Sequence, residues 1–107
     1  MLWSVRLATG AEADIAEIAT WTLHRFGPRQ AEIYVGTLLG GLRSLGDGPN
    51  ALGTSGLGQV APNLRLFRVP RTRHVVIFRA DFAAQQIQIL RILHASMDPA
   101  LHLPPEA

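Results

Sequence analysis

Apolar residues change their spacing halfway along this 107-residue chain, and no other feature limits the possible folds as much. Over Ala11–Phe26, and again from Pro28 to about Leu45, they recur every three or four residues, as on one face of an α-helix. In the second half they gather instead into three runs of strand length, Leu64–Val69, His74–Arg79 and Gln86–His94. The spacing therefore predicts two helices followed by three strands.

The segments between these runs predict how the elements are joined. Leu2–Ala8 alternates apolar and polar residues, which favours a strand at the start of the chain, and Thr9 after it can cap the first helix. Gly27 suits the end of one helix and Pro28 the first turn of the next, so the two helices form a tight hairpin. The glycine-rich stretch Asn50–Ala61 predicts a loop.

These elements predict an α+β fold with an N-terminal strand, a two-helix hairpin and then a three-stranded antiparallel meander. The short segments Pro70–Arg73 and Ala80–Gln85 turn the chain between the late strands, which favours antiparallel pairing. Residues 1–107 are expected to form a single domain. The apolar stripe of the first helix, which includes Leu23 and Phe26, is expected to face the sheet.

The predicted sheet is apolar on both faces. The tightest hairpin turns place Val69 opposite His74 and Arg79 opposite Ile87. One face then carries Leu64, Leu66, Arg68, Val75, Ile77, Arg79, Ile87, Ile89, Arg91 and Leu93, and the other carries Arg65, Phe67, Val69, His74, Val76, Phe78, Gln88, Leu90, Ile92 and His94. Because two helices cover only one face, we expect the other to be covered by another chain or by the C-terminal tail through Leu101 and Leu103.

All ten basic residues are arginine, and five of them lie between residues 65 and 79. In the predicted register Arg68 and Arg91 flank Val75 on neighbouring strands, about 10 Å apart, and Arg79 lies further along the same face. Such a surface suits an acidic amphipathic peptide or a phosphate backbone. Alternatively, each arginine stem covers the core while its head reaches water.

Two stretches of the second half carry a resemblance to a known family. Arg73–Arg79 and Ile89–His94, followed by Met97-Asp98 and His102-Leu103, resemble the central strand, last strand and ending of ParE toxins, in the RelE/ParE superfamily. The first half resembles the same family more weakly, at Leu7, Ala13-Asp14-Ile15, Phe26-Gly27, Gln30-Ala31 and Tyr34.

The resemblance implies a toxin of a toxin–antitoxin pair with the fold predicted above. It implies a ParD-like antitoxin as partner, in a hetero-oligomer, and DNA gyrase as the target inhibited by binding. The expected antitoxin- or target-binding residues are Arg68, Arg79, Arg91, Val75, Ile77, Met97 and Asp98. RelE relatives instead cleave messenger RNA on the ribosome.

RNA cleavage needs an acid, a base and cations. This chain has no lysine, and its only tyrosine, Tyr34, lies in the second predicted helix. Arg68, Arg91 and His94 make a minimal nuclease set, but His94 falls on the opposite sheet face from the two arginines and is better explained as a structural residue. A non-toxic interaction protein is the third possibility.

Several functions are not expected. The chain has no cysteine, which excludes disulfides and thiolate ligands, and His24 and His74 lack partners at metal-ligand spacing. We expect no cofactor, no metal, no membrane partner and no direct sequence-specific DNA binding. No signal segment or membrane-length apolar run is visible, so a cytoplasmic location is expected.

Overall fold

The computed structural model describes residues 2–104, so Met1 and the last three residues of the predicted tail lie outside it. The elements in chain order are β1 (Ser4–Leu7), α1 (Thr9–Phe26), α2 (Pro28–Arg43), a 3-10 turn η1 (Ser44–Asp47), β2 (Thr54–Leu57), β3 (Ala61–Arg68), β4 (His74–Asp81), β5 (Gln86–His94) and a second 3-10 turn η2 (Pro99–Leu101). This order confirms the predicted α+β fold. None of the described helices is long and apolar enough to cross a membrane.

The strands form one sheet in the order β1-β5-β4-β3-β2. β1 runs parallel to β5, whereas the other neighbours are antiparallel. The prediction of a loop over Asn50–Ala61 was wrong in part, because β2 lies within it and pairs with β3 from Thr54 opposite Phe67. The glycines and small polar residues of this segment show no alternating strand pattern. β2 is a strand because its backbone pairs with that of β3.

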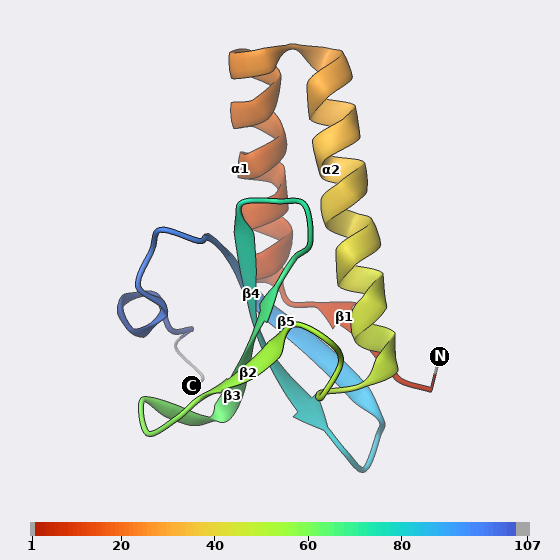
Figure 1. The fold of residues 1–107 in the computed structure, drawn as a ribbon, viewed down its shortest axis with the longest axis vertical. Helices are drawn as coiled ribbons and strands as arrows, with labels where there is room; N and C mark the ends of the chain where they lie inside the picture. The colour runs from red at the N-terminus through yellow and green to blue at the C-terminus, as the bar shows by residue number, and fades with distance from the viewer. Residues whose placement is uncertain (1, 105–107) are drawn as a thin grey trace.

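The two helices form the predicted hairpin, and Figure 1 shows its outer half extending well beyond the sheet. Gly27 adopts φ +90° at the corner and Pro28 starts α2, as expected. Thr9 was predicted to cap α1, but the N-cap is Ala8, without a side-chain hydrogen bond, and Thr9 is already helical. The inner half of α2 lies so close to the sheet that Gly41 contacts Val69.

The predicted register is right for β3–β4 and wrong for β4–β5. Arg68 pairs with Val75 as expected. On β5, however, Val75 pairs with Leu93, and a bulge between Ile77 and Phe78 shifts the register of the rest of the pair. The predicted register is already one residue off at the turn, where Arg79 pairs with Gln88 rather than with Ile87. An offset of one residue reverses the face of the side chains concerned, and the bulge adds a second offset beyond Phe78.

Two apolar cores lie on opposite faces of the sheet. The core under the helices contains Ala11, Leu38, Leu42, Leu45, Phe67, Val69, Val76, Phe78, Ile87, Ile89 and Ile92. The core on the other face contains Ala61, Leu64, Val75, Ile77, Leu90 and Leu93, with Ala8, Leu57, Leu66 and Leu103 packed against it. Because the register is offset by one residue between the turn and the bulge, Ile87, Ile89 and Leu90 lie on the faces opposite to those predicted.

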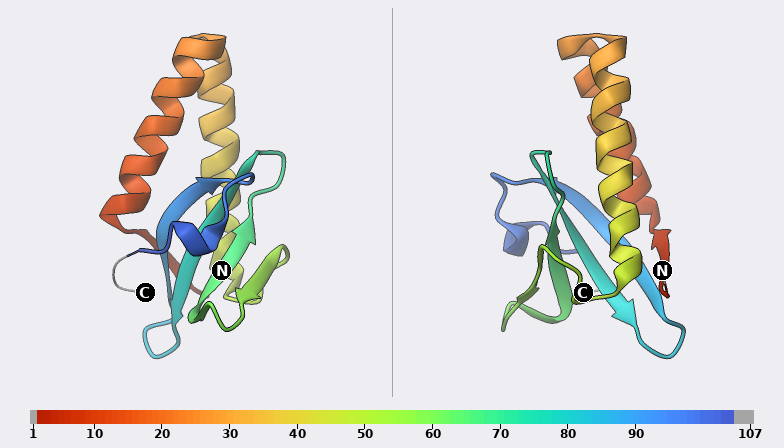
Figure 2. Two further views of the ribbon diagram at one scale, coloured as in Figure 1. Left: turned by 90° about the vertical axis from the view of Figure 1, so that its left-hand side faces the viewer. Right: turned by 45° about the vertical axis from the view of Figure 1, so that its right-hand side comes forward.

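The second face is covered within the chain: of the two covers that were expected, another chain or the C-terminal tail, the structure shows the tail. Leu103 of the C-terminal tail packs on it, whereas Leu101, also expected to dock, is 78% exposed. Figure 2 shows η2 and the tail on the side of the sheet away from the helices. Any claim of a partner must therefore rest on other surfaces.

Candidate interaction surfaces

Arg91, one of the predicted anchor residues, is bound by Asp14 of α1. Its Nε donates to Asp14 Oδ2 at 2.8 Å and its Nη2 donates to Oδ1 at 3.1 Å. Asp14 Oδ2 also accepts the backbone N–H of Ile92 at 2.8 Å. The hydrogen bond of the Asp14 carboxylate raises the pKa of Arg91. The guanidinium is thus committed within the chain and is only partly available to a partner.

The other two predicted arginines remain at the surface. Arg68 is exposed at the end of β3, opposite Val75. Arg79 is exposed on β4, where its Nε donates to Gln88 Oε1 at 2.8 Å. The predicted geometry, with Arg68 and Arg91 on either side of Val75, was wrong because Leu93 rather than Arg91 faces Val75.

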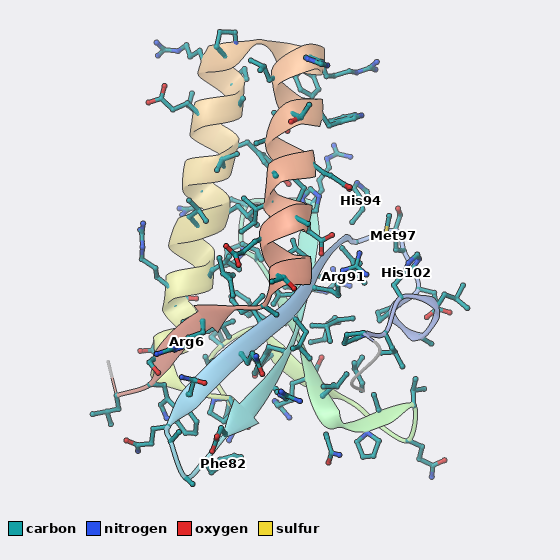
Figure 3. The ribbon with its side chains drawn as sticks, turned by 180° about the vertical axis from the view of Figure 1, so that it is seen from behind. Arg6, Phe82, Arg91, His94, Met97 and His102 are labelled. Atoms are coloured by element: carbon teal, nitrogen blue, oxygen red, sulfur yellow. The ribbon has the colours of Figure 1, made fainter. Side chains whose placement is uncertain are left out.

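The predicted aliphatic patch is not a surface in this conformation. Val75 and Ile77 are both buried, under the tail and the rim of the second core. Met97 is 43% exposed at the exit of β5, where Figure 3 shows it near His94. Asp98 accepts the backbone N–H of Ala100 at 3.0 Å and so starts η2, which makes it the turn residue that its position before Pro99 suggests.

The candidate nuclease set of Arg68, Arg91 and His94 is not assembled on one face. Arg68 lies on the sheet face away from the helices, as expected, and Arg91 is bound to Asp14. The His94 ring accepts the backbone N–H of Ser96 through Nδ1 at 3.1 Å and lies close to Ser96 Oγ. His94 therefore has local structural partners.

A histidine–tyrosine cluster that the sequence did not reveal joins α2 to the end of the sheet. His74 and His94 pair across β4 and β5 with ring centroids 5.6 Å apart, and the Tyr34 hydroxyl lies 2.6 Å from His74 Nδ1. That hydroxyl also accepts the backbone N–H of Arg73 at 2.9 Å. Burial, followed by repulsion from His94, lowers the pKa of His74. Among the described residues, no group of three potential ligands could hold a metal ion.

Large apolar side chains are exposed on the outer half of the helical hairpin. Trp21 is 62% exposed, Phe26 58% and Ile33 51%. Trp21 and Phe26 stack edge to face, with ring centroids 5.9 Å apart. Leu23 and Phe26 were predicted to lie on the stripe facing the sheet, but both are exposed because the hairpin extends past the sheet. Such a patch is typical of a protein-binding surface.

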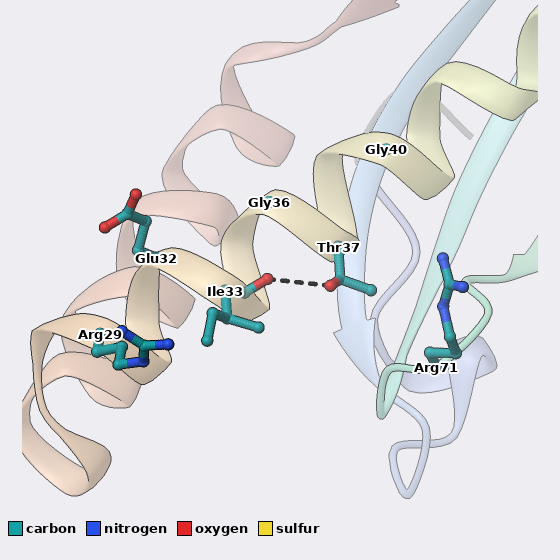
Figure 4. Close-up of a pocket in the computed structure, with 7 residues that line it drawn as sticks. All are labelled: Arg29, Glu32, Ile33, Gly36, Thr37, Gly40 and Arg71. Atoms are coloured by element: carbon teal, nitrogen blue, oxygen red, sulfur yellow. Dashed lines mark hydrogen bonds between the residues drawn. The ribbon is translucent and has the colours of Figure 1, made fainter.

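A shallow groove follows the outer side of α2 (Figure 4). It is lined by Arg29, Glu32, Ile33, Gly36, Thr37 and Gly40 of α2 and by Arg71 of the turn after β3. Among the glycines of α2, Gly41 packs closely against Val69, whereas a Cβ added at Gly36 or Gly40 would meet no neighbour within 4 Å in the described chain.

The Asp14–Arg91 pair was also missed from the sequence. Asp14 lies between Ala11 and Ile18 at helical spacing, so it falls on the buried stripe of α1. A lone acid on an apolar stripe signals a buried partner, and that signal was available without coordinates.

Comparison with known proteins gives consistent results. The family described as "ParE toxin of type II toxin-antitoxin system, parDE" matches residues 5–99. Toxin ParE1 of Caulobacter vibrioides is 33% identical over 100 residues, which cover 92% of this chain and 95% of that protein.

Two solved structures share the fold. A chain of the chromosomal ParDE system from P. aeruginosa superposes with a TM-score of 0.69 at 24% identity, covering 87% of this chain and 96% of that one. A chain of the RelBE2 toxin-antitoxin complex from Mycobacterium tuberculosis gives 0.58 at 22% identity, covering 88% and 99%.

Proposed function

Because this chain belongs to the ParE family of toxins from type II toxin–antitoxin systems, we propose that it inhibits DNA gyrase by binding and that a ParD-like antitoxin neutralises it. The observation that carries the proposal is the similarity to Toxin ParE1, which spans nearly the whole of both chains. The resemblance noted in the sequence associates this family with gyrase rather than with the ribosome.

Two features of the described residues support inhibition by binding. Arg68, Arg91 and His94, the set that RNA cleavage would use, do not converge on one point. Two large exposed apolar side chains, Trp21 and Phe26, lie instead on the protruding hairpin, far along the chain from that set. A protruding apolar patch suits insertion between surfaces of a larger protein.

The antitoxin is proposed to bind the hairpin rather than the aliphatic patch of the sheet. Val75 and Ile77 are buried, so the hydrophobic part of the interface falls to Trp21, Phe26 and Ile33. An antitoxin segment running from the hairpin toward the exit of β5 would meet Met97 and Asp98, with Arg68 as a charged anchor. Arg91 would take part only by leaving Asp14.

The test compares two activities of the purified chain. Gyrase supercoiling should be inhibited, and the product of a neighbouring antitoxin gene should relieve that inhibition. The same protein should not stimulate cleavage of messenger RNA on ribosomes. The substitution His94→Gln should leave gyrase inhibition unchanged. RNA cleavage without any effect on gyrase would reverse the assignment, and absence of both activities together with normal growth would favour a non-toxic interaction protein.

A further inference from the structure

Three polar side chains form a row across neighbouring strands of the sheet. Arg6 on β1 pairs with Gln88 on β5, and Gln88 pairs with Arg79 on β4. The residues that precede or follow them by one position, Val5, Ile87 and Ala80, pack into the core under the helices. Because side chains alternate along a strand, the row lies on the face away from the helices. Figure 3 shows Arg6 on β1, beside β5.

The row presents mainly hydrogen-bond donors. Arg79 Nε donates to Gln88 Oε1 at 2.8 Å. The amide N–H groups of Gln88 and the terminal guanidinium N–H groups of Arg79 take no part in this hydrogen bond and can donate to a ligand. Arg6 lies on the other side of Gln88 with a second guanidinium, so the two cations are two strand spacings, about 10 Å, apart at the backbone. Both arginines are exposed.

Neither arginine has an anionic partner within residues 2–104. The only ion pair in this part of the chain joins Asp14 to Arg91. The acid nearest in strand position is Asp81, in the next row of the same face, opposite Gln86. Its Oδ1 accepts the backbone N–H of Ala84 at 3.1 Å, so it serves the turn. Arg6 and Arg79 place two positive charges at the surface on either side of the Gln88 amide, and this arrangement favours the binding of an external anion.

The distribution of charge over the whole sheet points the same way. The strands contain Arg6, Arg65, Arg68, Arg79 and Arg91 but only one acid, Asp81. The other described acids lie on helices, turns or loops. The sheet therefore carries a local excess of positive charge although the whole chain has a formal charge of only +2.

We propose that Arg6, Gln88 and Arg79 bind phosphate groups of a DNA backbone. Guanidinium groups match phosphate oxygens in geometry, and contacts of this kind position a protein on DNA without reading its sequence. The site is consistent with the expectation that the chain makes no sequence-specific DNA contact. Its place in the toxin's action rests on the proposed function, because the DNA concerned would be the DNA held by gyrase.

The surroundings of the row favour DNA over an acidic peptide. A peptide partner gains affinity by burying apolar side chains, but the apolar residues next to the row, Leu90 and Ile77, are already buried within the chain. The exposed aromatic side chains lie off this face: Trp21 and Phe26 are on the hairpin, and Phe82, which is 69% exposed, packs edge to face against Trp3 of the core under the helices. RNA carries the same phosphate groups, so an RNA strand serves as a competitor in the test below.

The direct test measures binding of a fluorescein-labelled 24-base-pair DNA duplex by the full chain, using anisotropy at several salt concentrations. The variants R6Q and R79Q should each weaken binding by about threefold to tenfold at low salt, and each should lower the slope of log K against log salt by about 1. R79K, which keeps the charge but loses the planar fork, should bind between wild type and R79Q. Duplexes of unrelated sequence should respond alike.

Matched controls remove one positive charge elsewhere. Arg25 and Arg43 are exposed on the helices, so R25Q and R43Q change the net charge equally and should bind DNA like the wild type. Thermal unfolding should show that all five variants remain folded. If R6Q and R25Q weakened DNA binding equally, the proposal would be overturned, because the loss would then follow from the lower net charge and not from the row.

Two further outcomes separate this proposal from the proposed function. If an RNA strand or polyglutamate displaces the duplex at lower concentration than unlabelled DNA does, the assignment to DNA is wrong. If the wild type inhibits gyrase while R6Q and R79Q bind DNA normally, the row has no such role but the toxin assignment stands. If the row binds DNA and the wild type leaves gyrase unaffected, the site stands and the gyrase assignment fails.

Discussion

Asp14 of α1 holds Arg91 of β5 through two hydrogen bonds and binds the backbone N–H of Ile92 with the same carboxylate. β1 pairs with β5 only as far as Leu7 opposite Ile89, so the edge of β5 has no strand partner beyond that point. There the Asp14 carboxylate accepts the backbone N–H of Ile92, as a carbonyl group of a neighbouring strand would. The pair therefore connects the helical hairpin to the end of the sheet.

Replacing Asp14 should destabilise the fold. Asp14→Ala leaves the N–H of Ile92 without its acceptor and Arg91 without its counter-charge, and because the Arg91 side chain is 33% exposed, we expect a loss of about 2–3 kcal/mol rather than the larger cost of a fully buried pair. Urea unfolding measures it. Glu17→Ala, an exposed acid on the same helix, should cost less than about 0.5 kcal/mol. Equal effects would contradict a special role for Asp14.

Stability should fall in mild acid because of His74. Its pKa is lowered in the folded chain by burial and by His94, with Asp14 acting in the opposite direction. The folded state therefore favours the neutral ring, whose contribution is complete above the unfolded pKa of about 6.5 and is lost as the pH falls through the lower folded value. Urea midpoints between pH 8 and pH 5 should decrease more for the wild type than for His74→Gln. Parallel curves would show that His74 is not responsible.

Substitutions of the glycines of α2 should have opposite signs. Gly41→Ala places a methyl group against Val69 and should destabilise the chain by roughly 1–3 kcal/mol. Gly36→Ala and Gly40→Ala point into open space and should stabilise the chain by about 0.5–1 kcal/mol through helix propensity. Thermal unfolding of the three variants checks this, and a stabilising Gly41→Ala would disprove the close contact with Val69.

The tail should contribute to the second core through Leu103 and not through Leu101. Leu103 packs against the buried cluster around Val75, and Leu101 is exposed. We expect Leu103→Ala to cost about 1–2 kcal/mol and to increase binding of a hydrophobic dye, because it uncovers the aliphatic face. Leu101→Ala should change neither. Similar behaviour of the two variants would mean that the tail does not cover this face in solution.

Exposed aromatic residues of the hairpin should matter for the antitoxin and not for folding. Trp21→Ala and Phe26→Ala remove side chains that are largely exposed, so unfolding free energies should change by less than about 1 kcal/mol. Affinity for the antitoxin, measured by calorimetry, should fall by tenfold or more if these residues anchor the interface. Leu52→Ala, at an exposed leucine far from the hairpin, is the control. An unchanged affinity would place the antitoxin elsewhere.

The local elements were predictable because each depends on short stretches of chain. Helical spacing in residues 11–26, the Gly27-Pro28 corner and the tight turn that pairs Val69 with His74 are all set by neighbours in sequence. β2 was missed since its pairing with β3, and not its own residues, makes it a strand. The candidate site was less predictable. The sequence indicates which arginines lie on the strands, but not that Arg91 bonds to Asp14 or that Arg79 bonds to Gln88.

The sequence by itself determined both helices and every strand except β2, that both sheet faces are apolar, and that the cations are arginines. Tertiary structure alone decided that β1 lies beside β5, that Arg91 bonds to Asp14, that Arg6 and Arg79 lie on either side of Gln88, and that the tail covers the second face through Leu103 and not Leu101. The reason is physical. The spacing of residues along the chain predicts the conformation of a few neighbouring residues, whereas contacts between distant residues depend on how whole elements pack. The register of β4 and β5 also depends on a bulge that no short sequence pattern predicts.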